Sequence, residues 1–279
     1  MSEAGTWLEA AFLGVVQGLT EFLPISSSAH LRIAGEFLPS ATDPGAAFTA
    51  ITQIGTEAAV LLYFRKDIWR IASAWLRAPM GGKPDLANDV RLGWLVIIGT
   101  LPIVVLGLLF KDMIETSVRS LYITASMLII FGIILGLADH FGRRVKDMSS
   151  MSVKDGILLG FAQAMALIPG VSRSGGTISI GLLLGFTREA AARYSFLLAI
   201  PAVLASGFYQ LVKSWGEFGP YGVGPTLLAT AIAFFVGYGV IVLFLKIVST
   251  RSFMPFVWYR LALGVVILGL LWGGVLQPY

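Results

Sequence analysis

The sequence of 279 residues has no cysteine, only two histidines, and charged side chains at only 13% of its positions. Without cysteine there are no disulfide bonds and no thiolate-ligated metals, so carboxylates or histidine would have to hold any metal ion. No run of lysine or arginine is present, and the net charge of +4 is spread over the chain, which argues against a nucleic-acid partner. Hydrophobic residues make up 56% of the chain, and the mean hydropathy of +0.82 exceeds that of soluble domains. The composition therefore predicts an integral membrane protein.

Six apolar stretches approach the roughly 20 residues that a membrane-spanning helix requires. They lie near 46–64, 92–110, 120–138, 190–211, 225–245 and 255–274. Two further apolar stretches, 7–38 and 154–186, are interrupted by the polar sequences LPISSSAH and IPGVSRSGGT. The two apolar runs within each stretch have the length of half-helices, so both stretches are predicted to enter the membrane and turn back. We therefore expect an all-α integral membrane protein with one membrane domain over 1–279, six transmembrane helices and two re-entrant helix hairpins.

Lysine and arginine concentrate in three loops, which are 65–91, 139–155 and the loop around Lys246 and Arg251. These loops lie on one side of the membrane if the six windows span it. Because cytoplasmic loops carry the excess of basic residues, both chain ends are expected outside. The first re-entrant hairpin then enters from outside and the second from the cytoplasm.

A weak internal repeat relates the two halves of the chain. A shift of 146 residues places Gln17 on Gln163, and a further slip of one residue aligns the two polar centres. An odd number of spans separates the copies, so the second copy, approximately 154–274, would be inverted relative to the first, approximately 7–138. Inverted repeats with broken helices are common in transporters, where the broken segments meet near the membrane midplane.

The first broken stretch carries groups suited to nucleophilic chemistry. Gln17 and Glu21 lie four residues apart on one helical face. If a helix restarts at the serine run, as the capping preference of serine suggests, Ser27 and His30 share a face and could form a nucleophile and its base. Glu21 would orient His30, or bind a divalent ion with Gln17. A serine-rich cap that only satisfies backbone groups is the plainer alternative, but ionisable residues at membrane depth favour a functional role.

The second broken stretch has the features of a phosphate-binding loop. The sequence PGVSRSGGT places helix-breaking and small residues before an apolar run, so N–H groups at the start of the next helix can bind an anion. Arg173 adds a planar donor fork that matches phosphate. The alternative is a polar hinge whose arginine reaches the lipid headgroups. Joined by the inverted repeat, the two stretches would place a nucleophile, a base, a carboxylate and an anion-binding arginine in one cavity.

Two lesser features involve polar residues within apolar windows. Thr49, Gln53 and Thr56 or Glu57 recur at helical spacing, and this polar stripe could support the site or only pack against other helices. Arg260 lies close to the start of the last span and is interpreted as an anchor at the membrane interface.

The sequences VVQGLTEFLPISSSAHL at 15–31 and ALIPGVSRSGGTISIGLLLG at 166–185, with a weaker match in SFLLAIP at 195–201, resemble the undecaprenyl-diphosphate phosphatase family, also known as the bacitracin-resistance protein family. The resemblance runs essentially end to end. It implies hydrolysis of undecaprenyl diphosphate to undecaprenyl phosphate and inorganic phosphate, which recycles the lipid carrier for peptidoglycan and other cell-wall synthesis and confers bacitracin resistance. It also implies a divalent cation, Mg²⁺ or Ca²⁺, and a site in the bacterial inner membrane that opens to the outer face.

By motif position, the resemblance makes Ser27 the nucleophile, His30 its partner, Glu21 the acidic residue and metal ligand, and Arg173 the phosphate-binding arginine. The residues expected to line the substrate phosphates are Ser26, Ser172, Ser174, Gly175, Thr177 and Gln17. Gln17 stands where many family members have a second glutamate, which leaves one carboxylate in the motif.

Several alternatives stay open at this point. His30 could attack directly, or a water activated by Glu21 could. A transporter or lipid-phosphate flippase would use the same inverted-repeat plan, but it needs no nucleophile with its base. A scaffold subunit would leave buried ionisable groups such as Arg173 without purpose. The expected partners are a polyprenyl diphosphate and membrane lipids; the oligomeric state is open, a homodimer included.

Overall fold

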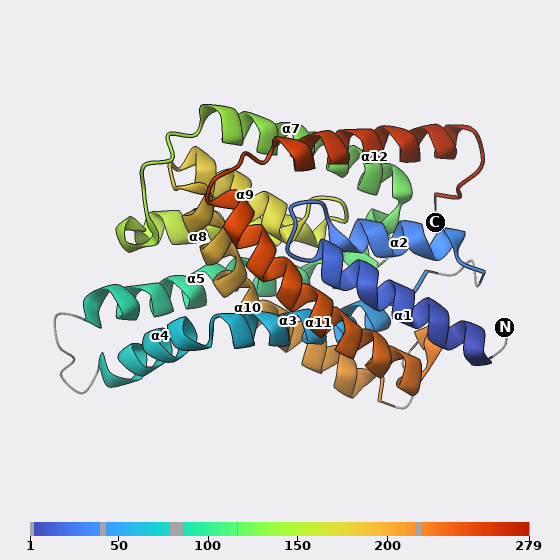
Figure 1. Cartoon of the computed structure of the whole chain (residues 1–279), viewed down its shortest axis with the longest axis horizontal. Helices are drawn as coiled ribbons and strands as arrows, with labels where there is room; N and C mark the ends of the chain where they lie inside the picture. The colour runs from blue at the N-terminus through green and yellow to red at the C-terminus, as the bar shows by residue number, and fades with distance from the viewer. Residues whose placement is uncertain (1–2, 40–42, 79–85, 116, 216–218, 279) are drawn as a thin grey trace.

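A computed structural model describes residues 3–39, 43–78, 86–115, 117–215 and 219–278 as helices joined by short loops, with one isolated bridge between Lys146 and Phe186 in these ranges. The helices are α1 Glu3–Thr20, α2 Ser27–Phe37, α3 Gly45–Tyr63, α4 Arg65–Arg77, α5 Ala87–Leu109, α6 Lys111–Glu115, α7 Leu121–Phe141, α8 Val153–Ala164, α9 Arg173–Leu183, α10 Arg188–Lys213, α11 Val223–Val248 and α12 Met254–Trp272. Short 3₁₀ turns lie at Ser117–Arg119, Met148–Ser150, Met165–Leu167 and Gly219–Tyr221. The predicted all-α class is confirmed (Figure 1).

Each of the six predicted membrane windows contains a helix. Five helices, α5, α7, α10, α11 and α12, are long and apolar enough to cross a membrane, and α3 with α4 forms a sixth candidate that bends by 78°. Large apolar side chains on their outer faces, such as Leu108 and Phe235, are each 74% exposed within the chain. Such faces are stable against lipid tails rather than water. The chain is a multi-pass membrane protein.

Helix α4 was not expected from the sequence, which indicated only a basic loop there. Its charged face carries Asp67, which accepts hydrogen bonds from Arg70 at 3.1 Å and from Arg193 of α10 at 2.9 Å. Its apolar face buries Ile71 and Ala74. A helix with one charged and one apolar face at the end of a membrane bundle is suited to the interface.

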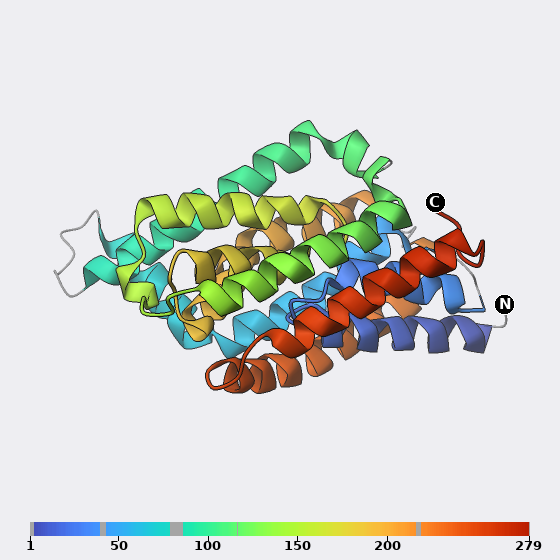
Figure 2. The ribbon, with the colours of Figure 1, turned by 90° about the horizontal axis from the view of Figure 1, so that it is seen from above.

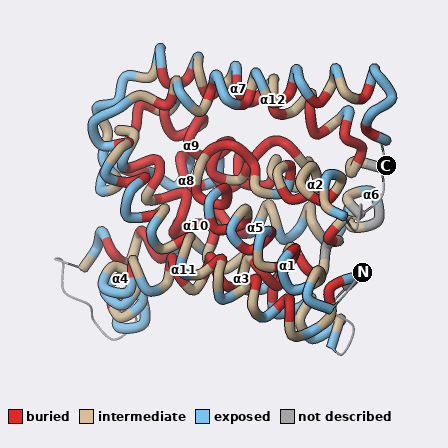
Figure 3. Tube along the Cα trace, turned by 45° about the vertical axis from the view of Figure 1, so that its right-hand side comes forward, coloured by how far each residue is buried: buried red, intermediate tan, exposed pale blue. Residues whose placement is uncertain are grey.

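The two broken stretches form helix–turn–helix units whose turns meet in the interior. The first consists of α1, a turn over 21–26 and α2; the second consists of α8, a turn over 168–172 and α9. Figures 1 and 2 show the two units entering from opposite ends of the bundle, with both chain termini at the end that the first unit enters. Buried residues gather where the two turns approach each other (Figure 3).

The two turns share an unusual backbone conformation at one position. Ser26 has φ 73° and Ser172 has φ 71°, a left-handed region that residues other than glycine seldom adopt. The two serines lie 146 residues apart, so the turns match at this position without the one-residue slip that we expected. The strained backbone persists only because the surrounding structure holds it, and such strain is typical of functional sites.

The helices that precede the turns pack closely against a spanning helix of the other half. A Cβ atom on Gly14 of α1 would lie 2.5 Å from the Ala229 carbonyl of α11, and one on Gly160 of α8 would lie 2.5 Å from the Gly99 carbonyl of α5. Small residues allow such backbone contact between helices in membranes. Helices α7 and α12 pack side by side along one flank (Figure 2). The boundaries of the two repeats stay a prediction.

Candidate active site

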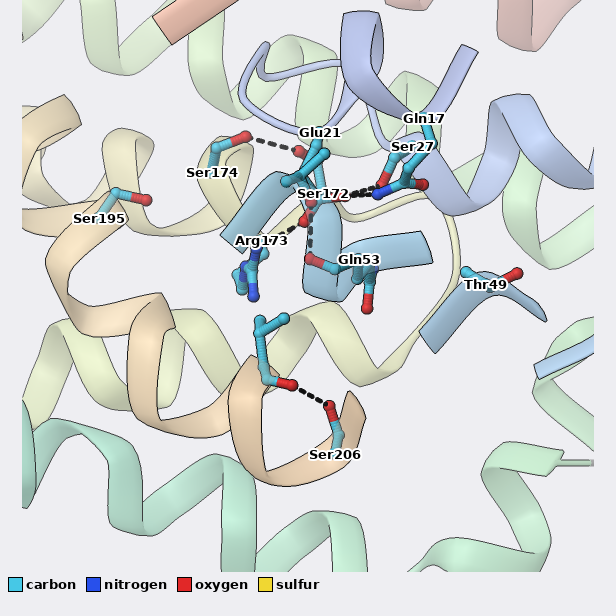
Figure 4. Close-up of polar contacts among 12 residues, drawn as sticks. Gln17, Glu21, Ser27, Thr49, Gln53, Ser172, Arg173, Ser174, Ser195 and Ser206 are labelled. Carbon is cyan, nitrogen blue, oxygen red and sulfur yellow. Dashed lines mark hydrogen bonds and ion pairs between the residues drawn. The ribbon is translucent and has the colours of Figure 1, made fainter. Parts of the chain in front are cut away.

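The Glu21 carboxylate is the centre of a polar cluster that joins the two turns. Its Oε2 atom accepts hydrogen bonds from the Ser27 hydroxyl at 2.6 Å and from the Gln17 amide at 2.6 Å. Its Oε1 atom accepts a hydrogen bond from the Arg173 guanidinium at 2.5 Å, which is also an ion pair. Figure 4 shows the four side chains converging from α1, the turn that follows it, α2 and α9. The structure therefore brings together three of the four predicted catalytic residues.

Local folding explains this convergence. The α1 helix ends at Thr20, and the turn is anchored by Phe22, which is 1% exposed. Ser27 is the first residue of α2. Because helical side chains tilt toward the helix N-terminus, the Ser27 hydroxyl points back into the turn and reaches Glu21.

The predicted hydrogen bond between Ser27 and His30 is absent from the cluster, although both residues belong to α2. His30 Nδ1 lies 2.7 Å from the Ser26 carbonyl oxygen and must donate, because a carbonyl only accepts. His30 Nε2 lies 2.7 Å from the hydroxyl of Tyr259 on α12. Both ring nitrogens are therefore engaged elsewhere, and His30 fixes the strained Ser26 backbone while Glu21 takes the position predicted for the base.

The predicted phosphate-binding side chains of the second turn also hold that turn in place. The Ser172 hydroxyl accepts from the Gly175 N–H at 3.1 Å, which caps α9, and the Ser174 hydroxyl donates to the Leu23 carbonyl at 3.1 Å, which ties the second turn to the first. Thr177 donates to the Arg173 carbonyl at 2.7 Å and lies 2.5 Å from the Ser195 hydroxyl of α10. These hydrogen bonds support Arg173 at the start of α9, and the Gly175 N–H is bonded to the Ser172 hydroxyl.

Arg260 was interpreted as an interface anchor, and that interpretation is wrong. Its side chain is fully buried at 0% exposure. Its guanidinium donates to backbone carbonyls of both turns, and these hydrogen bonds stabilise the buried charge. The acceptors are Pro24 at 2.8 Å, Gly170 at 2.7 Å and Val171 at 3.1 Å, with Leu128 at 3.1 Å and Met127 at 3.3 Å on α7. A Cβ atom on Gly175 would lie 2.8 Å from the guanidinium, so that glycine makes room for Arg260.

The N-termini of the half-helices α2 and α9 both face the cluster. Each helix begins at the cluster and runs outward, α2 from Ser27 and α9 from Arg173. The positive ends of two helix dipoles are therefore directed at the same point, where they favour a bound anion.

A cavity of about 210 Å³ adjoins the cluster. It is lined by Ser28, Leu31, Arg32, Asp43, Thr49, Ala50, Gln53, Arg119, Thr124 and Pro169. Among these lining residues, Asp43 pairs with Arg32 at 3.6 Å and with Arg119. Thr49 and Gln53 of the polar stripe thus face a cavity next to the cluster (Figure 4).

Several buried acceptor atoms of the site have no hydrogen-bond partner. They are the Oε1 atom of Gln17 and both carboxylate oxygens of Glu57. Within the described residues no group of three histidine, aspartate or glutamate side chains is placed to hold a metal ion. Mg²⁺ usually binds one or two carboxylates and keeps its other positions for water and substrate phosphates, so Glu21 with these free oxygens fits such an ion.

Sequence reasoning missed the roles of Tyr259 and Asp43 and did not decide that of Glu57. Tyr259 lies within a predicted apolar span, yet its hydroxyl contacts His30 across 229 residues of sequence. No local pattern predicts such a contact. The signal for Glu57 was present as an acidic residue inside a predicted span.

Known proteins are similar to this chain over nearly its whole length. The family described as bacitracin resistance protein BacA matches residues 10–266. Undecaprenyl-diphosphatase 2 of Agrobacterium fabrum is 69% identical over 271 residues, 97% of this chain and 98% of that protein. Undecaprenyl-diphosphatase of Micrococcus luteus is 62% identical, with 98% and 99% covered, and that of Paenarthrobacter aurescens is 65% identical, with 95% and 97% covered. The chain therefore belongs to the bacitracin resistance protein BacA family.

Proposed function

We propose that this protein hydrolyses undecaprenyl diphosphate to undecaprenyl phosphate and inorganic phosphate, which recycles the lipid carrier of cell-wall synthesis and confers bacitracin resistance. One observation carries the proposal: the Ser27 hydroxyl and the Arg173 guanidinium bind the two oxygens of the same Glu21 carboxylate, at 2.6 Å and 2.5 Å. The Glu21 carboxylate, the proposed proton acceptor, thereby contacts both the proposed nucleophile Ser27 and the phosphate-binding Arg173. The three groups lie between two helix N-termini.

The diphosphate would bind at the cluster with its prenyl chain in the surrounding lipid. Arg173 and the N-termini of α2 and α9 supply the positive charge that the phosphate oxygens need. Phosphoryl transfer depends mostly on charge neutralisation and in-line positioning, and both turns provide rigid backbone for that purpose. Arg173 would exchange Glu21 for the substrate, which leaves Oε1 of Glu21 available to the cation while Oε2 stays in place to receive the Ser27 proton.

In the proposed reaction, the Ser27 oxygen bonds to the terminal phosphorus while the bond from that phosphorus to the bridging oxygen breaks. The Ser27 proton passes to Glu21, its hydrogen-bond acceptor, and undecaprenyl phosphate departs with the bridging oxygen. Water then attacks the phosphoserine, Glu21 returns its proton to the Ser27 oxygen, and inorganic phosphate leaves.

A divalent cation, Mg²⁺ or Ca²⁺, is part of the proposal as a cofactor held at Glu21. When bound, it would neutralise charge on the diphosphate oxygens. The free oxygens near Glu21 support this assignment, because hard cations take oxygen ligands.

The proposed location is the bacterial inner membrane, with both termini outside and the site open to the outer face. The basic helix α4 and the loop between α7 and α8 lie at the end of the bundle opposite the termini, which supports that orientation.

The test is phosphate release from undecaprenyl diphosphate by purified, detergent-solubilised protein, with and without a chelator. Release by the wild-type protein that is lost in Ser27→Ala and Arg173→Ala, and reduced by chelator, is the expected result. If the folded wild-type protein binds the lipid but releases no phosphate, the hydrolase proposal fails and a lipid transporter becomes the better explanation.

A further inference from the structure

Glu57 of α3 is a buried acid that the proposed reaction leaves without a role. Its side chain is 0% exposed, and both of its carboxylate oxygens lack a hydrogen-bond partner. An ionised carboxylate without a hydrogen-bond donor is unfavourable at this depth. A purely structural position would more readily hold an apolar residue.

The surroundings of Glu57 belong to the active site. It is close enough to Arg173 and to Glu21 for their charges to act on it. It lies four residues after Gln53 on α3, one helical turn beyond a residue that lines the cavity.

A third free acceptor atom lies on Gln17, which is also 0% exposed. Its amide nitrogen donates to Glu21, but its Oε1 oxygen has no partner. Three acceptor oxygens, one of Gln17 and two of Glu57, are therefore buried without a donor among the described residues. Because buried acceptors are almost always satisfied, these three point to a missing positive group.

The chemistry of the three oxygen atoms indicates which positive group would bind there. Carboxylate and amide oxygens are the ligands that hard divalent cations prefer, and such cations need no tetrahedral cage of histidines. Glu57 thus offers a second carboxylate beside that of Glu21, from the different helix α3.

We propose that Glu57 is the second carboxylate ligand of the active-site divalent cation, together with Glu21 and the Gln17 carbonyl oxygen. The inference rests on the proposed function, since it assigns a ligand to the cation included there. It makes Gln17 and Glu57 an interdependent pair: a carboxylate at either position suffices.

The test measures Mn²⁺ binding to purified, substrate-free protein by electron paramagnetic resonance, so the readout does not depend on hydrolysis. Glu57→Gln is expected to weaken Mn²⁺ binding by at least about tenfold, the scale on which ligand-shell changes act. The double variant Gln17→Glu with Glu57→Gln is expected to recover affinity to within about threefold of wild type. Glu9→Gln is the matched control, because Glu9 is also a buried glutamate but lies near the start of α1 beside Tyr221.

Wild-type affinity in Glu57→Gln would overturn the proposal, and so would a folded Glu57→Gln protein whose loss is not recovered by Gln17→Glu. If Glu57→Gln does not fold, the single variant Gln17→Glu decides: a third carboxylate at one ion should tighten Mn²⁺ binding, and unchanged or weaker binding refutes the shared site. Mn²⁺ binding that follows these expectations in a protein releasing no phosphate would reject the hydrolase and keep the metal ligand.

Discussion

Arg173 donates to the Glu21 carboxylate at 2.5 Å, although 152 residues separate the two in sequence. The contact joins the two turns across the middle of the bundle. Without substrate, the ion pair neutralises a guanidinium and a carboxylate that are both largely buried. In the proposed reaction, substrate phosphate would compete with Glu21 for the Arg173 guanidinium, so substrate binding would release Glu21.

Replacement of Arg173 by lysine tests whether the donor fork matters beyond its charge. A lysine ammonium is a point charge that cannot bond two phosphate oxygens in one plane. We expect Arg173→Lys to lower kcat/KM for phosphate release by about 100-fold, close to 3 kcal/mol. Arg251→Lys, in an exposed loop, is the control and should keep wild-type kinetics. An Arg173→Lys enzyme with normal kcat/KM would show that only the charge is needed.

Removal of the Ser27 hydroxyl tests the nucleophile. Ser27→Ala should lower kcat by about 1,000-fold or more while lipid binding persists, since Arg173 and the helix N-termini remain. Ser249→Ala removes an exposed hydroxyl that bonds only a local carbonyl, so it should behave as wild type. Rapid-quench detection of phosphoserine with wild-type enzyme would identify the intermediate directly. A fully active Ser27→Ala enzyme would shift the reaction to a water activated by Glu21.

Substitution of His30 tests whether this residue acts as a base or holds the turn in place. His30→Asn can still donate to the Ser26 carbonyl, whereas His30→Ala cannot. We therefore expect His30→Asn to retain at least about ten times the activity of His30→Ala, the scale of one lost hydrogen bond to a buried group. Equal and severe losses in both variants would instead support His30 as the base, and steady-state phosphate release distinguishes the two outcomes.

Much of the fold follows from the sequence because membranes impose simple rules. The six windows, such as the one that became α7, are visible as apolar runs of sufficient length. The broken stretches are equally visible, since LPISSSAH and PGVSRSGGT cannot continue a lipid-exposed helix. Helix α4 was not predicted because its many charged residues are also typical of a loop. Its helical structure depends on the packing of its apolar face against α5.

The chemistry was predicted less completely, for reasons that are geometric. Helical spacing correctly placed Ser27 and His30 on one short helix, but spacing does not show that the Ser27 hydroxyl points back toward Glu21. Arg260 shows the same limit: its position in the sequence is near a span terminus, yet the side chain faces inward and bonds both turns. Long-range contacts such as these depend on how the helices pack.

Loss of the Arg260 guanidinium should loosen both turns at once. Arg260→Met keeps much of the length of the side chain but leaves the Pro24 and Gly170 carbonyls without this donor. We expect a destabilisation of about 3 kcal/mol, observed as a lower midpoint of thermal unfolding in detergent, because several buried hydrogen bonds to a charged group are lost. Arg251→Met removes an exposed arginine and should leave the midpoint unchanged. An unchanged midpoint in Arg260→Met would show that the turns hold together without this side chain.

Gly170 offers the sharpest test of how tightly the second turn is built. Its φ of +92° lies in the left-handed region, and a Cβ atom there would lie 2.2 Å from the Thr124 carbonyl oxygen. Gly170→Ala therefore combines backbone strain with a clash that only movement of the turn can relieve, and we expect a cost of at least about 2 kcal/mol. Because Arg173 follows three residues later, phosphate release should fall together with the midpoint of thermal unfolding. Gly269→Ala is the matched control, since a Cβ atom on Gly269 meets nothing within 4 Å. If both alanine variants unfold at the wild-type temperature, the turn is more adaptable than its backbone angles indicate.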